Sequence, residues 1–479
     1  MAGALVFFMQ CGFAMLEAGI VQPKNATNIL FKNLIDASLA AIGFWLIGYG
    51  IAYGTDKGGF IGTDNFAIDK IFNNAGAEGG EDLFGNAVGA SDGWEGWFFQ
   101  WAFAGAAATI VAGSVCERTK IEAYFCYSIV LTVFIYPVVV HWGWGSGFLS
   151  AWGAATGPLF RKNEESNGMI DFAGSGIVHM VGGFSGLMGA IVVGPRTGRF
   201  VDGQVVELFQ GNKILQSLGT FILWFGWYGF NCGSTLMISA NAANVAGKAA
   251  VTTTLAAACG GVTATFLSKV FTGHYDISMG LNGVLAGLVS ITANCSVVNP
   301  WHAVFIGTIG ALFLFAGHKL LKVCKIDDPC DAAVVHGICG YWGLIATGIF
   351  CVDSNVQYAA YPNVNNACAR GEQFGVQVVG GLAIIAWTCA TAGLTFVVVD
   401  AIVGMRVSKE VEEEGIDVSE HGQAFDGPPT TVEKVQMVTE PVPMQPTAFM
   451  PSQPMMAPPG YPPVFGGMGY AQPMRMGFP

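Results

Sequence analysis

The chain has 479 residues, of which 52% are hydrophobic and only 11% are charged, and its mean hydropathy is +0.51. A soluble domain carries about 25% charged residues, so this composition excludes a water-soluble globular protein and indicates an integral membrane protein. The formal net charge of −12 comes almost entirely from residues 55–95 and 406–479. Because the sequence offers no basic patch that would hold phosphates, a nucleic-acid partner is excluded.

Apolar runs recur along the whole chain, and each approaches or exceeds the roughly 20 residues that a bilayer core requires. They cover 2–21, 28–54, 96–116, 123–142, 171–193, 214–239, 249–267, 278–297, 301–321, 331–351 and 373–405. The first run has neither a charged n-region nor a cleavage pattern, so it is predicted to span the membrane rather than to act as a signal peptide. The sequence thus predicts an all-α polytopic domain over 1–405 with eleven transmembrane helices and its termini on opposite sides.

Lysine and arginine predict the orientation of these helices. With the N-terminus outside, the cytoplasmic loops hold ten basic residues and the outer loops hold six, although the long acidic loop 55–95 lies outside. This excess favours an outer N-terminus and a cytoplasmic C-terminus under the positive-inside rule.

The chain changes character after residue 405. Residues 406–426 are polar and predicted to be partly helical, and residues 427–479 are rich in Pro, Met and Gly, which predicts a disordered tail. The 12 cysteines show no metal-binding spacing, so we expect small buried hydrophobic residues and no metal or cofactor. Cys351 and Cys368 flank a predicted outer loop, and the sequence leaves open whether they pair.

Two apolar runs contain the same polar motif, an aspartate followed eight residues later by a histidine. Asp171 precedes His179 in DFAGSGIVHMVGG, and Asp328 precedes His336 in DPCDAAVVHGICG. In a helix, eight residues rise about 12 Å, which predicts each aspartate near a membrane face and each histidine near the middle. With five helices in each half, 1–193 and 214–351, the second half starts from the opposite side of the membrane. This is an inverted repeat, whose functional site commonly lies between the halves.

The alternative explanation for each histidine is a packing role, with its ring hydrogen-bonded to a backbone carbonyl. An ionisable group at mid-bilayer costs roughly 2.5–3.5 kcal/mol or more unless it faces the protein interior. Two histidines in matching positions therefore favour a shared functional site over two unrelated packing residues.

Aromatic residues gather in FFQWAFAG, HWGWGSG and GWYGFNCGS. The members are Phe99, Phe103, Trp144, Trp227 and Phe230, with Ser234 following them. Singly, such residues are interfacial anchors or core filler. Together they offer π faces to a small cation, which is attracted within about 6 Å of a ring.

Several stretches together resemble the ammonium transporters of the Amt/Mep/Rh superfamily, and most of all its eukaryotic, plant or algal Amt branch. They are MQCGFAMLEAGIVQPKN, FQWAFAGAAATIVAGSVCER, DFAGSGIVHMVGG, GWYGFNCGS, VHGICGYWGLIATGIF and GIDVSEHGQAF. The resemblance covers roughly residues 5–425. It implies eleven transmembrane helices, an inverted five-plus-five repeat, a homotrimer with one pore in each subunit, a plasma-membrane location and no enzymatic activity.

The resemblance also implies roles for the outer residues. Trp144, Phe99 and Ser234 would recruit ammonium, or methylammonium, at the outer face. Asp171 would stabilise this site and the adjacent helix end without necessarily touching the ion.

Deeper residues take the remaining implied roles. Phe103 and Phe230 would form the gate, and His179, His336 and Trp227 would line the pore below it.

Two further residues follow from the same resemblance. Asp328 would be the inner structural counterpart of the outer aspartate, and Ser419, in the cytoplasmic regulatory segment 406–426, would be phosphorylated by a kinase.

The expected chemistry depends on the one property that separates ammonium from potassium, a removable proton. An apolar pore in the lipid bilayer excludes a bare cation and admits neutral ammonia, and imidazoles titrate near neutrality and can relay the released proton. Three alternatives remain open at this stage: an ammonium sensor, an Rh-like gas channel, and a membrane electron carrier whose histidines ligate haem.

Overall fold

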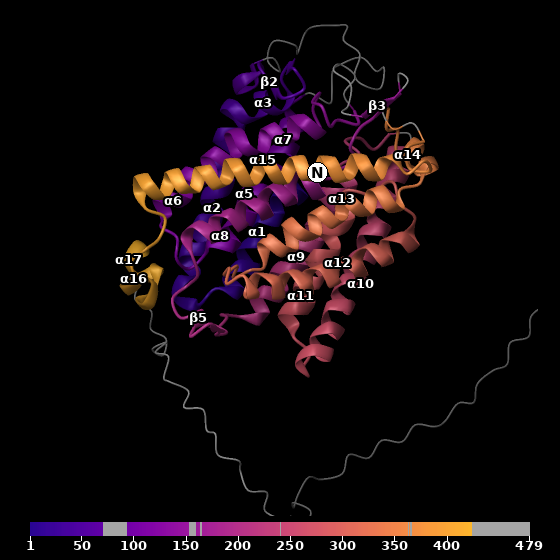
Figure 1. Cartoon of the computed structure of the whole chain (residues 1–479). Coiled ribbons are helices and arrows are strands. Elements are labelled where there is room, and N and C mark those ends of the chain that lie inside the picture. The colour runs from indigo at the N-terminus through magenta and orange to yellow at the C-terminus, as the bar shows by residue number, and fades with distance from the viewer. Residues whose placement is uncertain are drawn as a thin grey trace, which may run out of the picture. The chain divides into compact units, whose positions relative to one another are not determined.

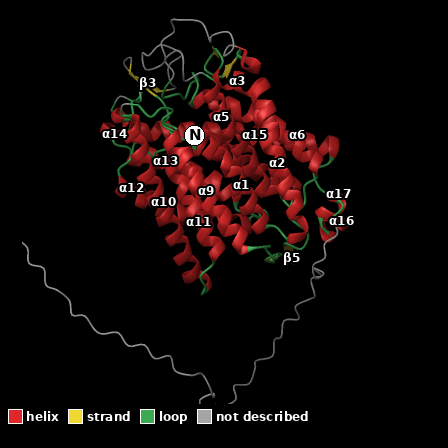
Figure 2. Ribbon diagram, turned by 180° about the vertical axis from the view of Figure 1, so that it is seen from behind, coloured by secondary structure: helices red, strands yellow, loops and turns green. Residues whose placement is uncertain are grey.

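The computed structural model describes residues 1–69, 93–152, 160–162, 165–239, 241–362, 364 and 366–423 (Figure 1). The predicted tail 427–479 and most of the acidic loop 55–95 lie outside these residues. Helices dominate the described chain (Figure 2). The strands form three short antiparallel hairpins, β1 (Asp56–Lys57) with β2 (Ile61–Gly62), β3 (Phe160–Lys162) with β4 (Glu165–Asn167), and β5 (Phe200–Val201) with β6 (Gln204–Val205).

Helices follow one another along the chain with short connections. Up to residue 193 they are α1 (Ala2–Ile20), α2 (Ala26–Gly43), α3 (Tyr49–Tyr53), α5 (Trp94–Val115), α6 (Ile121–Val130), α7 (Tyr136–Gly143) and α8 (Val181–Val193). Beyond it they are α9 (Lys213–Gly233), α10 (Ala242–Thr272), α11 (Ile277–Thr292), α12 (Pro300–Val323), α13 (Cys339–Phe350), α14 (Asp353–Tyr358), α15 (Glu372–Val403), α16 (Lys409–Glu414) and α17 (Ile416–His421). Short 3₁₀ turns add η1 (Pro23–Asn25) and η3 (Phe66–Ile68).

The predicted apolar runs all fall on helices, and the prediction of an all-α polytopic fold is confirmed. Among the described residues, nine helices are long and apolar enough to cross a membrane. The helix α11 has 16 residues, and α9 is not among the nine. Some predicted ends were wrong: the run 214–239 stops being helical at Gly233, and the run 249–267 extends to Ala242–Thr272.

Four helices contain a π-helical stretch, in which the backbone winds more loosely than in an α-helix. These stretches are η2 (Phe44–Gly48), η4 (Leu131–Ile135), η5 (Ser175–Met180) and η6 (Ala333–Ile338). The segments η5 and η6 open the two helices that carry the Asp–His motifs. π-helical turns are frequent at functional sites. Their presence in both Asp–His segments therefore makes these two helices candidates for the functional site.

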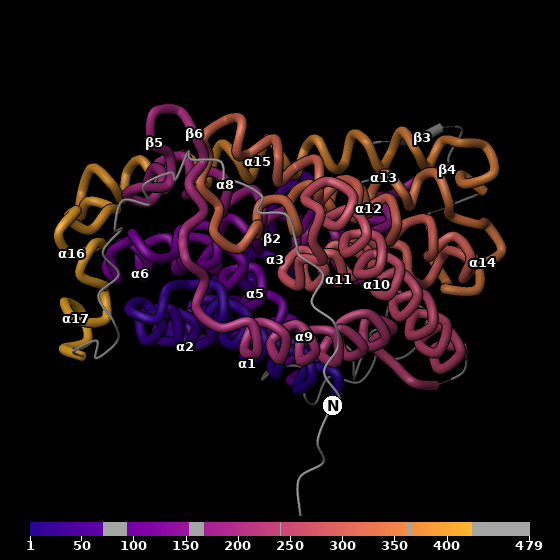
Figure 3. Tube along the Cα trace, turned by 90° about the horizontal axis from the view of Figure 1, so that it is seen from below, coloured from indigo at the N-terminus to yellow at the C-terminus, as the bar shows by residue number. Residues whose placement is uncertain are grey.

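Long helix–helix contacts hold the bundle together. The helix α1 packs along α9, and α10 packs against α11 and α12 (Figure 3). The long helix α15 crosses the bundle at the front of Figure 1 and contacts α6, α8 and α13. At the centre, η5 contacts η6 and α8 contacts η6.

Glycine allows the closest of these approaches. A Cβ atom on Gly183 of α8 would lie 2.2 Å from the backbone nitrogen of Gly337 in η6. The two backbones therefore touch where no side chain fits, as small residues permit between membrane helices.

The segment after α15 folds back onto the end of the bundle where α2 begins. The carboxylate of Asp417 in α17 accepts hydrogen bonds from the backbone N–H groups of Thr27 (2.8 Å) and Asn28 (2.7 Å). The ammonium group of Lys24 donates to the carbonyl oxygens of Glu412 (2.9 Å) and Glu413 (2.6 Å). This acidic segment thus caps the positive end of α2.

Cys351 and Cys368 form a disulfide that closes the loop between α13 and α15, with their Cα atoms 5.7 Å apart. The pairing that the sequence left open is therefore present. The cysteines Cys116, Cys295, Cys330 and Cys339 are buried and unpaired, as expected for small hydrophobic side chains.

Candidate functional site

Aromatic residues from three helices, α5, α7 and α9, form a group of packed rings. The ring centroids of Phe103 and Phe230 are 4.1 Å apart, and those of Phe99 and Phe103 are 4.7 Å apart. Trp144, at the end of α7, meets Phe103 edge-on at 5.7 Å and an interplanar angle of 83°. Phe103 and Phe230 are fully buried, whereas Trp144 is half-buried. The structure therefore brings the predicted recruitment and gate rings into one contiguous group.

Ser234 closes the end of α9 beside this group. Its hydroxyl donates a hydrogen bond to the carbonyl oxygen of Phe230 (2.8 Å), and the side chain is half-buried. A Cβ atom on the neighbouring Gly233 would lie 3.2 Å from the ring of Phe99. The hydroxyl oxygen of Ser234 is thus held at the end of α9, next to the residue that contacts Phe99, and it keeps acceptor capacity.

Asp171 lies before the helix that carries His179 rather than within it. Its carboxylate accepts hydrogen bonds from the backbone N–H groups of Gly174 (3.1 Å), Gly176 (2.9 Å) and Ile177 (2.8 Å). Its carbonyl oxygen accepts a hydrogen bond from the indole N–H of Trp144 (2.7 Å). The aspartate therefore caps η5 and fixes the tryptophan, while both carboxylate oxygens point at backbone.

Asp328 repeats this arrangement in the second half. It precedes η6, and its carboxylate accepts a hydrogen bond from the backbone N–H of Ala333 (2.7 Å). Ala333 stands five residues after Asp328, as Gly176 stands five residues after Asp171. The expectation that each Asp–His pair lies on a single α-helix, separated by a 12 Å rise, was wrong. Both aspartates cap a π-helical turn from outside, and the histidine follows within that turn.

The two histidines meet directly at the centre of the bundle. Their Nδ1 atoms are 3.1 Å apart, and their ring centroids are 5.2 Å apart. His179 is fully buried and His336 is 4% exposed. Because a hydrogen bond between two imidazoles requires one donor and one acceptor, at least one of the two Nδ1 atoms is unprotonated.

His179 also lies directly beneath the aromatic stack. Its ring stacks on Phe230 at 5.3 Å and on Trp227 at 5.1 Å. The indole N–H of Trp227 donates to the hydroxyl of Thr292 on α11 (2.8 Å), which fixes the plane of the indole. The rings of Phe103, Phe230, His179 and His336 therefore form a continuous series from the aromatic group to the middle of the bundle.

A small cavity of about 10 Å³, room for about one water-sized molecule, lies against His336. Apolar side chains make up most of its wall, among them Phe13, Leu16 and Val335, and Glu17 of α1 also lines it. The sequence places Glu17 within the apolar run 2–21, although no role for it was predicted. The signal was available, because an acid within an otherwise uncharged apolar run is rare.

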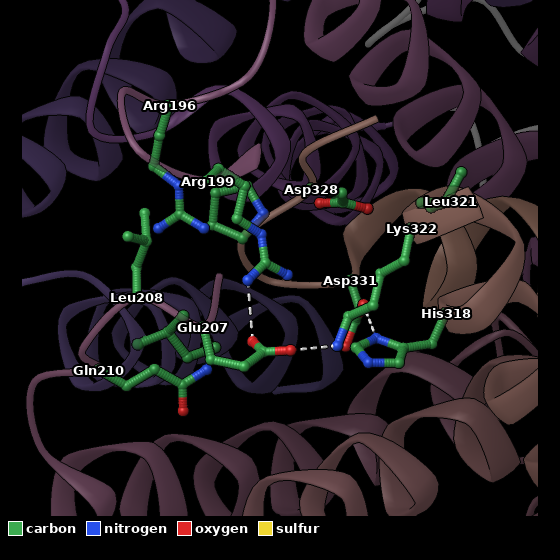
Figure 4. Close-up of a pocket in the computed structure, with 12 residues that line it drawn as sticks. Arg196, Arg199, Glu207, Leu208, Gln210, His318, Leu321, Lys322, Asp328 and Asp331 are labelled. Atoms are coloured by element: carbon green, nitrogen blue, oxygen red, sulfur yellow. Dashed lines mark hydrogen bonds and ion pairs between the residues drawn. The ribbon is translucent and has the colours of Figure 1, made fainter. Parts of the chain in front are cut away.

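A second, polar pocket of about 60 Å³, open to solvent on one side, includes Asp328 in its wall (Figure 4). Glu207 lies between Arg199 and Lys322 and accepts hydrogen bonds from both, at 2.9 and 2.5 Å. Partial burial acts to raise the pKa of Glu207, but these two cations outweigh it and lower the pKa to about 2. Asp331 accepts a hydrogen bond from His318 on the same wall (2.7 Å).

An ion-pair cluster behind this pocket joins three loops. Arg196 donates to both carboxylate oxygens of Asp327, at 2.7 and 3.0 Å, and also pairs with Glu117. Burial acts to raise the pKa of Asp327, but the hydrogen bonds and charge of Arg196 hold it well below its usual range. Sequence reasoning counted Arg196 among the basic residues of the cytoplasmic loops and did not predict the cluster, because its members are far apart in the chain.

Ser419 lies apart from this series of rings. It is exposed on α17, and its hydroxyl donates to the carbonyl oxygen of Ile416 (3.2 Å).

Comparison with known proteins identifies the family of the chain. Residues 1–425 match the Ammonium Transporter Family. The chain belongs to that family. Ammonium transporter 1 member 3 of Solanum lycopersicum is 41% identical over 437 residues, which cover 87% of this chain and 90% of that protein. Ammonium transporter Amt2 of Archaeoglobus fulgidus is 40% identical over 422 residues, which cover 88% and 85%.

The fold agrees as well. A solved structure described as "Sensor Amt Protein" superimposes with a TM-score of 0.75 at 34% identity and covers 88% of this chain and 96% of its own. The chain is therefore a multi-pass membrane protein of a transporter family and not an enzyme. The haem alternative conflicts with the geometry, because Nδ1 atoms 3.1 Å apart leave no room for a macrocycle between the rings.

Proposed function

We propose that this protein carries ammonium across a membrane by binding the cation at the outer aromatic group, removing its proton and conducting ammonia past the paired histidines. The observation that carries the proposal is the direct contact of the buried His179 and His336 beneath the stacked Phe103 and Phe230. An apolar series of rings that ends in a titratable pair suits a substrate that can shed its charge.

Binding at the outer group follows from its chemistry. The faces of Trp144 and Phe99 attract a small cation, by about 0.5–1 kcal/mol for each exposed ring and more when water is excluded. The Ser234 hydroxyl adds an acceptor for an N–H of ammonium. Asp171 holds Trp144 in place through its backbone carbonyl rather than pairing with the cation. Methylammonium, which also carries N–H groups, is expected to share the site.

Deprotonation follows from the closed stack below the outer group. Phe103 and Phe230 are fully buried and 4.1 Å apart, so a hydrated cation has no space between them and the rings must move for any passage. Loss of water disfavours the charged form. Neutral ammonia can then donate to, or accept from, the imidazole nitrogens of His179 and His336, and the proton can pass along their Nδ1–Nδ1 contact.

The membrane arrangement completes the proposal. We place eleven helices across the plasma membrane as an inverted repeat of 1–193 and 214–351, with the N-terminus outside and the C-terminus inside. Lys24, Arg118 and Arg196 gather at the end of the bundle to which the 406–423 segment is docked, which supports a cytoplasmic location for that end. We further propose a homotrimer with one pore in each subunit, and a kinase that acts on Ser419.

Uptake of labelled methylammonium, with current recording, in cells that lack their own ammonium transporters tests this function. His179→Ala and His336→Ala each remove one partner of the contact and are expected to abolish or alter transport. His274→Ala is the matched control, because His274 is exposed in the turn between α10 and α11. Unchanged uptake and selectivity in both pore variants, with normal assembly, would contradict the proposal.

A further inference from the structure

We infer that Glu17 is the proton acceptor on the inner side of the histidine pair, and that it returns the proton to ammonia in the inner cavity. The inference rests on the proposed function and names the group that completes it. It predicts that substrate leaves the pore as ammonium and that transport carries charge.

The position of Glu17 carries the inference. Glu17 and His336 line the same small cavity of about 10 Å³, room for about one molecule the size of water or ammonia, to which α1 contributes Phe13, Leu16 and Glu17. Phe13 stands one helical turn before Glu17, and its ring lies 6.2 Å from that of His336. Most of the remaining wall is aliphatic, so among the described residues the carboxylate is the one acidic group that lines the cavity.

One carboxylate oxygen is anchored, and the other faces the cavity wall. Oε2 accepts a hydrogen bond from the side-chain amide of Asn33 on α2 (2.8 Å). Within the described chain, Oε1 has no hydrogen-bond partner. A Cβ atom added to Gly113 would lie 3.3 Å from Oε1 of Glu17 and 3.3 Å from the Sγ of Cys330. Because Oε1 accepts no hydrogen bond from the protein, it is available to exchange a proton with a ligand in the cavity.

The charged neighbours of Glu17 are occupied elsewhere. Lys32 of α2 donates its hydrogen bond to the carbonyl oxygen of Thr119 (2.8 Å) and lies over the ring of Tyr124. Asp36 accepts hydrogen bonds from the hydroxyls of Tyr124 and Ser128. Neither side chain forms a hydrogen bond or ion pair with Glu17, so its proton exchange is left to the cavity.

A purely structural role is the competing explanation. The Asn33 hydrogen bond joins α1 to α2, and a glutamine at position 17 would keep both this bond and the volume of the side chain. The substitution Glu17→Gln therefore separates the two roles, because it removes proton acceptance and leaves the tether.

The proposed steps conserve protons and charge. The imidazolium of the histidine pair transfers one proton to the Glu17 carboxylate, which gives neutral imidazole and a carboxylic acid. The acid then transfers that proton to ammonia in the cavity, which regenerates the carboxylate and releases ammonium. The histidine pair and Glu17 both return to their starting states.

The experiment compares current with uptake in the same cells. For Glu17→Gln we expect most methylammonium uptake to remain, while the current per molecule taken up falls at least about tenfold, since a positioned proton acceptor contributes about 10²–10⁴-fold. Glu17→Asp, which keeps a carboxyl group, should restore much of the ratio. Glu122→Gln, at an exposed site on α6, is the matched control and should leave the ratio unchanged.

Three outcomes would overturn the assignment of Glu17. They are a wild-type ratio in Glu17→Gln, a parallel loss of uptake and current in an assembled Glu17→Gln protein, and wild-type uptake that carries no current. Failure of the proposed function looks different, because the wild-type protein would then accumulate no methylammonium.

Discussion

The contact between the two backbones at Gly183 offers a direct test of how the histidine pair is held together. In Gly183→Ala, the new Cβ would lie 2.2 Å from the nitrogen of Gly337, 2.7 Å from its Cα and 2.8 Å from the carbonyl carbon of His336. These are backbone atoms, so no side-chain rotation relieves the clash. Ordinary contact starts at 3.4 Å, and the difference from 2.2 Å requires α8 and η6 to separate by about 1.2 Å.

A separation of that size acts on the site one helical turn away. The Nδ1 atoms of His179 and His336 are 3.1 Å apart, close to the limit of a hydrogen bond, so a shift of about 1 Å breaks their contact. We expect Gly183→Ala to lose most methylammonium uptake and to destabilise the protein by about 1–3 kcal/mol, the usual cost of overpacking.

The assay for Gly183→Ala is uptake together with the melting temperature of the purified protein. Gly247→Ala is the control, because Gly247 is exposed in α10 and nothing lies within 4 Å of the place that a Cβ would take there. At this position the alanine should stabilise the helix by about 0.5–1 kcal/mol. Wild-type uptake and melting in Gly183→Ala would refute the reasoning, since the two backbones would then not be in contact.

Two further predictions concern the docked segment and the two caps. Ser419→Asp adds a negative charge between Asp417 and Glu420, which both hydrogen-bond to α2, so we expect the segment to detach more easily from the bundle. Proteolysis should then be faster, and uptake lower, than in Ser419→Ala. Equal proteolysis and uptake in the two variants would contradict this. Asp171→Asn should lower the melting temperature more than Asp328→Asn, because Asp171 accepts three backbone hydrogen bonds and Asp328 accepts one from Ala333. The reverse order would show that capping does not determine the stability of these segments.

The sequence was informative about the fold because lipid imposes a simple rule. A membrane span must satisfy its own backbone hydrogen bonds, so long apolar runs become helices, and all the predicted runs did. Helix ends were less predictable. Gly233 ends α9 although the apolar run continues to residue 239, because apolar composition fixes what lipid tolerates and not where backbone hydrogen bonding stops.

The site was predictable in its members and not in its geometry. Spacing selected His179 and His336, and the structure places them in contact. Spacing did not show that each aspartate lies outside its helix, because hydrophobic periodicity cannot distinguish a π-helical turn from an α-helical one. Glu17 was visible as an acid in an apolar run, but its place beside the inner cavity depends on how α1 packs, which one sequence does not specify.

The shared and differing parts of the two halves follow from the chemistry that each must perform. Both halves need a histidine held at one fixed depth, and each supplies it with the same device, an aspartate that caps a π-helical turn. Under the proposed function the outer end attracts a cation and removes its water, a task that aromatic rings suit. Under the same proposal the inner end returns the proton to ammonia, which the phenyl and indole rings of the outer group cannot do and a carboxylate can. On this reasoning a proton-accepting carboxylate belongs at the inner cavity, where Glu17 lies, whereas the carboxylate oxygens of Asp171 at the outer site are bound by backbone N–H groups.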